Sequence, residues 1–373
     1  NTMTFQVKLG SLGDKTRRIR ALSAPIARAG GANVAAAERA AELCKCDLLT
    51  AMVGEFPELQ GIMGTYYALA DGEPAEVAVA IREHYLPRGA GDELPQTQEG
   101  VAVAIADKLD TLAGIFEINE RPSGTKDPFG LRRAAIGILR ILIEKRLDLD
   151  LRPLIELALR SVREDISRIR AAAAAHSAAG AERNEPAGPR EAAAAQIYDF
   201  IMERLRAYYL ERATATGPGT ATALSNEMID AVLATRPGSP LDFDARLNAL
   251  GAFLELPEAT SLAAANKRIA NILRKAGEHP QSEVNVEYLR EAAEVRLFDA
   301  MQSLRDTVST SVARREYANA LGRLAQLRPP VDAFFDQVMV MDEDPKLRAN
   351  RLTMLAQLHG LFVGIADLSR LPG

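Results

Sequence analysis

The sequence predicts an all-α protein. Residues that favour helices (Ala, Leu, Glu and Arg) are abundant, and runs of β-branched residues are scarce. Apolar residues recur at helical spacing, whereas no segment alternates convincingly between apolar and polar residues. The chain has 373 residues, no tryptophan and 5% aromatic residues, so its core has to rest on Leu, Ile, Val, Ala and Met.

The first helix is expected to begin after Ser11. Asp14 follows three residues later, which fits a capping box, and a Gly-Gly pair ends the helix near residue 30. Further helices are expected over residues 35–53, 58–69, 77–85, 100–116, 127–146 and 151–175. Asp127 and Pro128 supply an N-cap and a first-turn proline for the helix over residues 127–146.

The composition divides the chain into three parts. Residues 1–170 are expected to form one helical domain. Residues 171–195 are rich in Ala, Gly and Pro and are interpreted as a linker or insertion, and residues 214–223 as a second flexible stretch. Residues 196–373 are helical again, with a last helix that is expected to begin at Asp344.

The charge is unevenly distributed. The net charge of −5 argues against a generally basic nucleic-acid-binding protein. However, residues 121–146 contain seven basic residues against two acidic ones, and residues 263–275 contain four basic residues and no acidic one. Such patches can hold phosphates because the Debye length is only about 8–10 Å at physiological salt. The alternative is that they are solvated helix faces. The basic residues are Arg121, Lys126, Arg132, Arg133, Arg140, Lys145 and Arg146 in the first patch, and Lys267, Arg268, Arg274 and Lys275 in the second.

The two cysteines indicate a reducing compartment. Cys44 and Cys46 lie too close together for a normal structural bridge, and no other cysteine is present. A C-x-C pair alone is a weak zinc signal, and thiols on an apolar helix are more often core residues. Neither a signal peptide nor a stretch of 18 uncharged apolar residues is found, so we expect a cytoplasmic protein.

Residues 45–47 carry the pattern of a broken metal site. In an HD phosphohydrolase, His and Asp residues from separate helices bind metal ions that activate water. Here Cys46 stands in the place of the histidine, before Asp47, and Asp107 or Asp110 would be the second carboxylate. Two carboxylates without imidazoles make a poor transition-metal site, so we expect no metal. The alternative for Asp107 and Asp110 is a helix with locally paired charges.

Two further segments combine basic residues with a helix. Residues 122–135 form a loop that feeds a helix, where free N–H groups beside Lys126 and Arg132 could hold a phosphate. The alternative is a capped helix whose arginines pair with acids on a neighbour. In residues 338–352, Arg348 and Arg351 are three apart and share a helix face, which suits contacts with RNA. Their alternative role is to pair with the nearby acids Asp342, Glu343 and Asp344.

Six segments follow the pattern of one known family, in the same order along the chain: residues 8–15, 47–72, 92–95, 122–135, 265–273 and 338–352. They resemble the beta subunit of the bacterial two-subunit glycyl-tRNA synthetase. Members of this family are larger, so the chain resembles the C-terminal half of such a subunit. The resemblance implies a degenerate HD-like domain over residues 1–170 and, over residues 196–373, a helical linker region and a DALR-like anticodon-binding bundle.

The resemblance also implies a function that composition does not. The family enzyme attaches glycine to tRNA with ATP, and the alpha chain carries out the adenylate chemistry with ATP and Mg. This fragment is therefore expected to be non-catalytic, with no cofactor of its own. Its expected partners are the alpha subunit and tRNA(Gly), with no DNA and no membrane. The residues expected to contact tRNA are Lys126, Arg132 and Arg133 towards the acceptor side, and Lys267, Arg268, Arg348 and Arg351 at the anticodon arm.

Two other functions remain open at this point. One is a surviving metal-dependent HD hydrolase that uses Asp47, Asp107 and Asp110 with a divalent ion. The other is a purely structural helical scaffold that docks the alpha chain.

Overall fold

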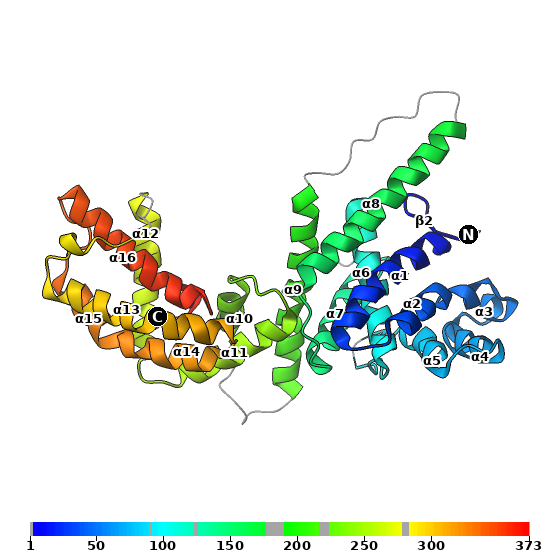
Figure 1. Cartoon of the computed structure of the whole chain (residues 1–373), viewed down its shortest axis with the longest axis horizontal. Helices are drawn as coiled ribbons and strands as arrows, with labels where there is room; N and C mark the ends of the chain where they lie inside the picture. Colours follow the sequence, from blue (N-terminus) through cyan, green and yellow to red (C-terminus); the bar gives the residue numbers. More distant parts are fainter. Residues whose placement is uncertain are drawn as a thin grey trace. The chain divides into compact units, whose positions relative to one another are not determined.

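A computed structural model describes residues 3–89, 91–122, 126–176, 190–215, 224–277 and 283–372 of the chain. Helices dominate these residues, so the predicted all-α fold class is confirmed. Within the described ranges, the strands are limited to a short antiparallel pair, β1 (Thr4–Gln6) and β2 (Gly10–Ser11). The chain divides into two compact units, which are coloured blue to green and green to red in Figure 1.

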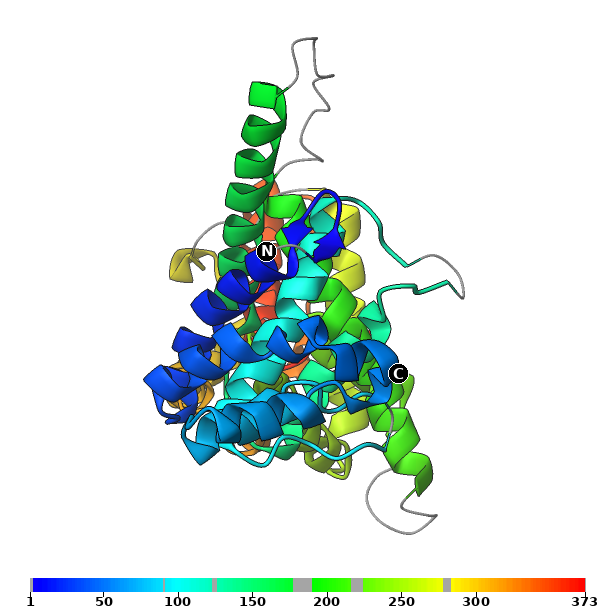
Figure 2. The ribbon, with the colours of Figure 1, turned by 90° about the vertical axis from the view of Figure 1, so that its right-hand side faces the viewer.

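Unit 1 comprises Asn1–Tyr208 and Gly238–Leu241. Figure 2 shows the green helix α8 extending past the other helices of this unit. Its helices are α1 (Leu12–Gly30), α2 (Val34–Leu43), η1 (Cys46–Leu49), α3 (Ala51–Glu55), η2 (Pro57–Leu59), α4 (Ile62–Ala70), α5 (Ala75–Glu83), α6 (Gln98–Glu117), α7 (Leu131–Glu144), α8 (Leu151–His176) and the first part of α9 (Arg190–Ala215).

Helix α6 forms the centre of unit 1. Its sequence is apolar on all sides apart from a few charged residues, and such a helix is stable only when it is surrounded. It packs against α1, α2, α5, α7 and α8, and most of its residues are buried. Consequently, the charged residues Asp107, Lys108 and Asp110 in its middle need partners from the surrounding helices.

Local capping residues determine where α1 begins and ends. The Ser11 side chain accepts a hydrogen bond from the backbone of Asp14, and the Asp14 carboxylate accepts one from the backbone of Ser11, so the predicted capping box is confirmed. Gly31 ends the helix with a left-handed φ of 72°, which glycine adopts without strain.

The predicted helix over residues 35–53 is wrong as one continuous element. The chain leaves α2 after Leu43, passes through η1 and starts α3, because the Thr50 side chain caps the new helix by accepting a hydrogen bond from Val53. The helix predicted over residues 58–69 begins only at Ile62, after η2 and Gly61, whose φ is 80°.

Unit 2 comprises Tyr209–Pro237 and Asp242–Gly373. Helix α13 packs against α14, α15 and α16, and α12 packs against α15 and α16. The largest fully buried side chains of this unit include Phe243 and Phe253 of α11, Phe334 of α15 and Phe362 of α16. The last helix begins after Asp344, as predicted, and the Asp344 side chain accepts a hydrogen bond from Lys346. The helices are α10 (Asn226–Leu233), α11 (Pro240–Leu254), α12 (Ala259–Ala276), η3 (Val286–Tyr288), α13 (Ala292–Ala313), α14 (Tyr317–Leu324), η4 (Ala325–Leu327), α15 (Arg328–Gln337), α16 (Pro345–Val363) and η5 (Leu368–Arg370), of which α11 starts in unit 1.

The predicted boundaries at residues 170 and 196 stay a prediction. Within the predicted linker, residues 171–176 and 190–195 belong to the ends of α8 and α9, and residues 177–189 lie outside the described residues. The same holds for residues 216–223 of the second predicted flexible stretch. Among the described helices, none is both long and apolar enough to cross a lipid bilayer.

Candidate functional site

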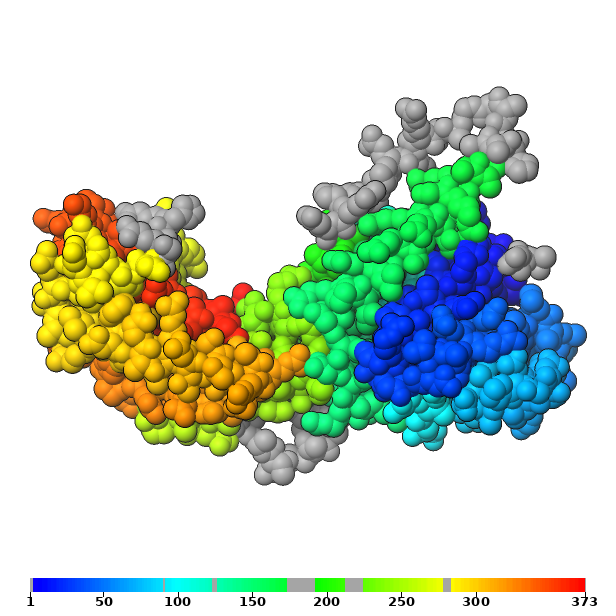
Figure 3. All heavy atoms as spheres, viewed as in Figure 1, coloured from blue at the N-terminus to red at the C-terminus, as the bar shows by residue number. Residues whose placement is uncertain are grey.

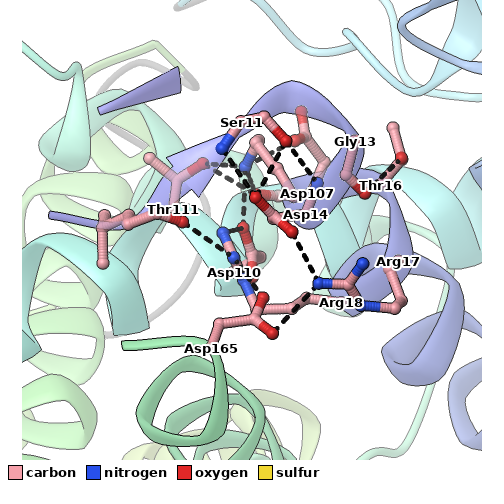
Figure 4. A network of polar contacts seen from close by, with 12 residues as sticks. Ser11, Gly13, Asp14, Thr16, Arg17, Arg18, Asp107, Asp110, Thr111 and Asp165 are labelled. Carbon is pink, nitrogen blue, oxygen red and sulfur yellow. Dashed lines mark hydrogen bonds and ion pairs between the residues drawn. The ribbon is translucent and has the colours of Figure 1, made fainter. Parts of the chain in front are cut away.

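A network of ion pairs joins α1, α6 and α8 in the core of unit 1. Asp110 of α6 is fully buried, and both its oxygens accept hydrogen bonds from Arg18 of α1, at 2.6 and 3.1 Å. The same guanidinium donates to Asp165 of α8 at 2.8 Å and to the Leu9 carbonyl at 3.2 Å. Figure 4 shows Asp110 and Asp165 converging on the Arg18 guanidinium. This arrangement satisfies a charge that would otherwise be very costly to bury.

Lys15 links this network to Asp107. Its ammonium lies 2.9 Å from one oxygen of Asp107 and 3.1 Å from Asp110, and it donates a hydrogen bond to the Thr111 hydroxyl at 2.8 Å. Lys15 is buried, so these contacts occur away from water. Burial alone would raise the pKa of Asp107, but Lys15 and Lys45 hold it well below its usual value, and the carboxylate stays charged.

Lys45 brings the second oxygen of Asp107 together with a buried histidine. The Lys45 ammonium lies 3.2 Å from Asp107 and 2.7 Å from Nε2 of His84, and it also stacks over the Tyr85 ring. Nδ1 of His84 contacts the carbonyl of Ile81, so this nitrogen carries the proton and Nε2 accepts the hydrogen bond from Lys45. Burial, and then the charge of Lys45, lower the pKa of His84 well below its usual value, so its ring is neutral.

The positions expected for a degenerate HD site do not converge on one point. Asp107 and Asp110 share the Lys15 ammonium, whereas Asp47 accepts hydrogen bonds from the backbone N–H groups of Gly61 and Gly64. Cys46 is exposed. In the part of the chain that the structure describes, no group of three or more His, Cys, Asp or Glu side chains is placed to hold a metal ion.

The Lys45 ammonium occupies the position that a metal ion would need. The lone pair of His84 and one oxygen of Asp107 are the donors that a divalent ion prefers, and both point at Lys45. A metal would have to displace this ammonium and leave it buried without its partners. The donor set therefore does not fit the metal-dependent hydrolase alternative.

The two cysteines differ in their surroundings. Cys44 is buried, and its thiol contacts the carbonyl of Ala41, as expected for a core residue. Burial raises the pKa of Cys44 to about 12, so the thiol is protonated and unreactive at neutral pH.

Sequence reasoning missed the cations of this network. Lys15 and Arg18 are three residues apart in a helix whose buried face also carries Ile19 and Leu22. Charged residues on an apolar helix face indicate buried partners, and this signal could have paired them with the acids of α6.

The neutral His84 predicts acid sensitivity. In the unfolded chain this histidine takes up a proton near pH 6.5, whereas in the folded chain its pKa is well below that value. The unfolded state therefore binds more protons below about pH 6.5, and the free energy of unfolding should fall there by up to about 1.4 kcal/mol per pH unit. Urea unfolding of the wild type and H84Q between pH 7 and pH 5 checks this. Other titrating groups contribute equally to both proteins, so the difference between their free energies of unfolding reports on His84 alone. If the free energy of unfolding changed with pH equally in the wild type and H84Q, a neutral buried His84 would be refuted.

The basic patch of unit 1 surrounds α7. Lys126 and Arg133 are exposed, and Arg132 is half-buried. The Asp127 carboxylate accepts hydrogen bonds from the backbone N–H groups of Leu131 and Arg132, at 2.8 and 2.9 Å. These N–H groups are thus satisfied by the protein, which favours a capped helix N-terminus over a phosphate site there. The helix begins only at Leu131, after Gly130, so the expected N-cap at Asp127 and first-turn proline at Pro128 are wrong, although the Asp127 side chain still binds the first N–H groups.

The basic patch of unit 2 lies on α12. Lys267 and Arg268 are exposed, as are Arg274 and Lys275 about two turns further along. No acidic residue occurs within α12, and Arg274 contacts Asn271 of the same helix. Arg268 also lies over the ring of Phe335, 4.3 Å from its centroid, which orients the guanidinium. This helix therefore presents several cations to solvent along one side.

Arg351 departs from the expected role in RNA contacts. Its side chain is only 4% exposed, and its guanidinium donates to Glu294 at 2.6 Å and to Asp342 at 2.7 Å. Glu294 is fully buried. Arg348 is half-buried and donates to the carbonyl of Asp342 at 2.9 Å. The ion pair of Arg351 with Asp342 is one of the pairings with nearby acids that formed the alternative, whereas its second partner, Glu294 on α13, was not among the expected acids.

Comparisons with known proteins agree with the resemblance found in the sequence. The family model described as "Glycyl-tRNA synthetase beta subunit" matches residues 1–223, and the model described as "DALR anticodon binding domain" matches residues 262–363. The glycine–tRNA ligase beta subunits of Pseudomonas putida (strain W619) and Pseudomonas fluorescens (strain Pf0-1) are 50% and 51% identical to the chain over 369 residues. Each alignment covers 99% of the chain and 49% of the relative. The chain thus spans about half the length of these curated relatives.

Proposed function

The chain belongs to the glycyl-tRNA synthetase beta subunit family, and on this basis we propose that it is a tRNA-binding, non-catalytic portion of such a subunit. In this role it supports the ATP-dependent attachment of glycine to tRNA(Gly) by an alpha/beta complex. The observation that carries the proposal is the row of exposed cations on α12, inside the segment that matches the anticodon-binding model.

Helix α12 supplies the chemistry that an anticodon arm requires. Lys267, Arg274 and Lys275 can neutralise phosphates, and neutralised phosphates release counterions, which drives binding. Arg268 offers a planar guanidinium held over Phe335, and such a group can stack on an unpaired base. Arg351 is not part of this surface, because it is buried against Glu294.

Unit 1 contributes a second, weaker set of RNA contacts in this proposal. Lys126, Arg132 and Arg133 belong to a patch in which basic residues outnumber acidic ones, and they would meet phosphates nearer the acceptor side. Elsewhere in the same unit, the buried ion pairs of Lys15, Arg18, Asp110 and Asp165 fix the positions of α1, α6 and α8 relative to one another.

The partners and the location follow from the proposed role. The alpha subunit would supply the site for ATP, Mg and glycine, and this chain would need no cofactor of its own. The complex would work in the cytoplasm and would bind neither DNA nor a membrane. The metal-dependent hydrolase is the less supported alternative. Nε2 of His84 accepts a hydrogen bond from the Lys45 ammonium, so this nitrogen is not available to bind a metal ion.

Charge reversal on α12 tests the proposal. The K267E/R268E variant should bind tRNA(Gly) about 10-fold or more weakly than the wild type in low salt, because it loses two cations and adds two anions beside the phosphates. The plot of log affinity against log salt should also become shallower by about 1 to 2. Fluorescence anisotropy with labelled tRNA(Gly) at several salt concentrations measures both effects.

The matched control reverses two other exposed arginines of unit 2. Arg296 and Arg305 lie on α13, and the R296E/R305E variant changes the net charge by the same amount. Its affinity should stay within about threefold of the wild type. Equal losses in the two variants would mean that net charge alone attracts the tRNA, and an unchanged affinity of K267E/R268E would overturn the role of α12.

A further inference from the structure

Asn271 lies in the middle of the cationic side of α12. From Lys267 onward, the exposed polar side chains of this helix are four cations and one amide, and the amide is that of Asn271. Residues three and four apart on a helix are neighbours on its surface. Asn271 therefore adjoins all four cations, which are Lys267 and Arg268 on the preceding turn and Arg274 and Lys275 on the following turn. Figure 3 shows the yellow residues, among which α12 ends, at the surface of unit 2.

Arg274 fixes the orientation of the Asn271 amide. Nη2 of Arg274 lies 2.7 Å from the Asn271 side chain, and because a guanidinium only donates, the accepting atom is the amide oxygen Oδ1. This oxygen keeps one lone pair, and the amide nitrogen Nδ2 keeps both hydrogens, for which the described residues provide no acceptor. A side chain that is already held in one orientation binds a ligand at a lower entropic cost. The amide is thus prepared to donate and to accept at the same time.

The four cations lack this combination of donor and acceptor. Lys and Arg side chains only donate hydrogen bonds, which suits the oxygens of phosphates. The edge of an RNA base carries donors and acceptors side by side, and an amide can pair with both through its nitrogen and its oxygen. Asn271 therefore has the chemistry that distinguishes bases, whereas Lys267 and Lys275 have the chemistry that positions the backbone.

A flat surface for a base lies one turn before Asn271. The Arg268 guanidinium lies over the Phe335 ring, 4.3 Å from its centroid, and Phe335 in turn contacts the ring of the buried Phe334. One face of the guanidinium is thus covered by protein, and the other face is turned away from Phe335. Sequence-specific RNA complexes use guanidinium planes to stack unpaired bases. A base stacked there has the Asn271 amide as its neighbour one turn along α12.

The elements that pack against α12 leave this side cationic. Helix α16 contains no acidic residue. On α15, Asp332 accepts a hydrogen bond from Ser261 and pairs with Arg328, whereas Asp336 is exposed. Asp367, which precedes η5, caps that helix. The acids of these elements are thus mostly paired or engaged in capping, and the exposed charge around the amide is mainly positive, which attracts a phosphate backbone.

We infer that Asn271 is the residue of α12 that determines which anticodon base is accepted. This inference rests on the proposed function, in which α12 binds the anticodon arm. Arg268 stacks an unpaired base of the anticodon loop, the Asn271 amide pairs with the edge of that base, and Arg274 positions the amide. The flanking Lys267 and Lys275 hold phosphates. The accepted edge presents a donor next to an acceptor, and a base that lacks this order is rejected because it leaves the amide unpaired.

Replacement of Asn271 by alanine tests the inference in the full-length subunit that contains this chain. Fluorescence anisotropy measures the dissociation constants for tRNA(Gly) and for tRNA(Gly) with single substitutions in the anticodon, and their ratio is the discrimination. N271A should lower the discrimination about 10-fold at the base that Asn271 contacts, because two hydrogen bonds to a base edge are lost. The slope of log affinity against log salt should stay unchanged, because no cation is lost.

Two controls separate base reading from charge and from the loss of an amide in general. K275M removes a neighbouring cation, so it should weaken the binding of all these tRNAs alike and make the salt slope shallower by about 1. Asn319 of α14 is also exposed, and it accepts a hydrogen bond from Arg323 of the same helix at 3.3 Å. N319A should therefore change neither the discrimination nor the salt slope.

The positioning role of Arg274 has a test of its own. R274M removes a cation together with the hydrogen bond to the Asn271 amide. It should make the salt slope shallower, as K275M does, and in addition lower the discrimination by about threefold, because the amide is no longer held in one orientation. Full discrimination in R274M would overturn the positioning role.

Two results would overturn the role of Asn271 itself. The first is full discrimination in N271A, and the second is an equal loss of discrimination in N319A. Both results would leave tRNA binding by α12 intact. If the wild-type subunit bound tRNA(Gly) no better than tRNA(Gly) with a substituted anticodon, the proposed function would fail instead, which distinguishes the two failures.

Discussion

Replacing Asp110 by alanine should lower the free energy of unfolding of unit 1 by about 3–5 kcal/mol, because it removes one partner of a buried ion pair. The carboxylate is fully buried and accepts two hydrogen bonds from Arg18. Without it, Arg18 keeps only Asp165 and one carbonyl, and the Lys15 ammonium loses one of its two carboxylates. Urea unfolding followed by circular dichroism measures the loss.

Two further variants separate this effect from a general loss of charge. Glu42 is about half exposed and pairs with Arg39 at the surface, so E42A should change the stability by at most about 0.5 kcal/mol. The R18M/D110L double variant should recover part of the stability lost in D110A, because it leaves no uncompensated guanidinium. A loss below about 1 kcal/mol in D110A would show that the network does not hold unit 1 together.

Replacing Arg351 by methionine should destabilise unit 2 by about 3 kcal/mol and affect tRNA binding only through folding. Methionine keeps the apolar stem but leaves Glu294 fully buried without its cation. The backbone N–H groups of Arg290 and Glu291 still donate to Glu294, so the penalty lies at the lower end of the range for a broken buried pair. Urea unfolding and tRNA anisotropy on the same samples measure both properties.

The control for Arg351 is Lys267, which should respond in the opposite way. K267A removes an exposed cation from α12, so it should weaken tRNA binding while stability stays within about 0.5 kcal/mol of the wild type. The binding assay is done at urea concentrations at which R351M is fully folded. If R351M no longer discriminated between tRNAs under these conditions, Arg351 would contact RNA after all.

The sequence predicted the fold class well because helix formation depends on local patterns. The capping box of Ser11 and Asp14 and the start of α16 after Asp344 are short-range features, and both were predicted correctly. The interruption between α2 and α3 was missed, because the apolar spacing continues across it while the Thr50 cap and the contacts of Asp47 break the helix.

The candidate site was harder to predict because its contacts are distant in sequence. Lys15 and Asp110 are 95 residues apart, and Lys45 and Asp107 are 62 apart, so the acids of α6 looked locally paired although their partners are Lys15 and Arg18 of α1 and Lys45 before η1. In the same way, Arg351 pairs with Glu294, 57 residues earlier, although its spacing from Arg348 suggested a shared solvent-facing side. The basic patch on α12, by contrast, was visible in the sequence because it is one uninterrupted helix without acids.

A footprint of tRNA(Gly) on this chain tests most directly the claim that α12 binds the anticodon arm. Hydroxyl-radical cleavage of the RNA should show protection of the anticodon arm by the wild-type chain and by the α13 control variant R296E/R305E. The K267E/R268E variant should lose this protection. Protection confined to other parts of the tRNA, or anticodon protection that persists in K267E/R268E, would contradict the account.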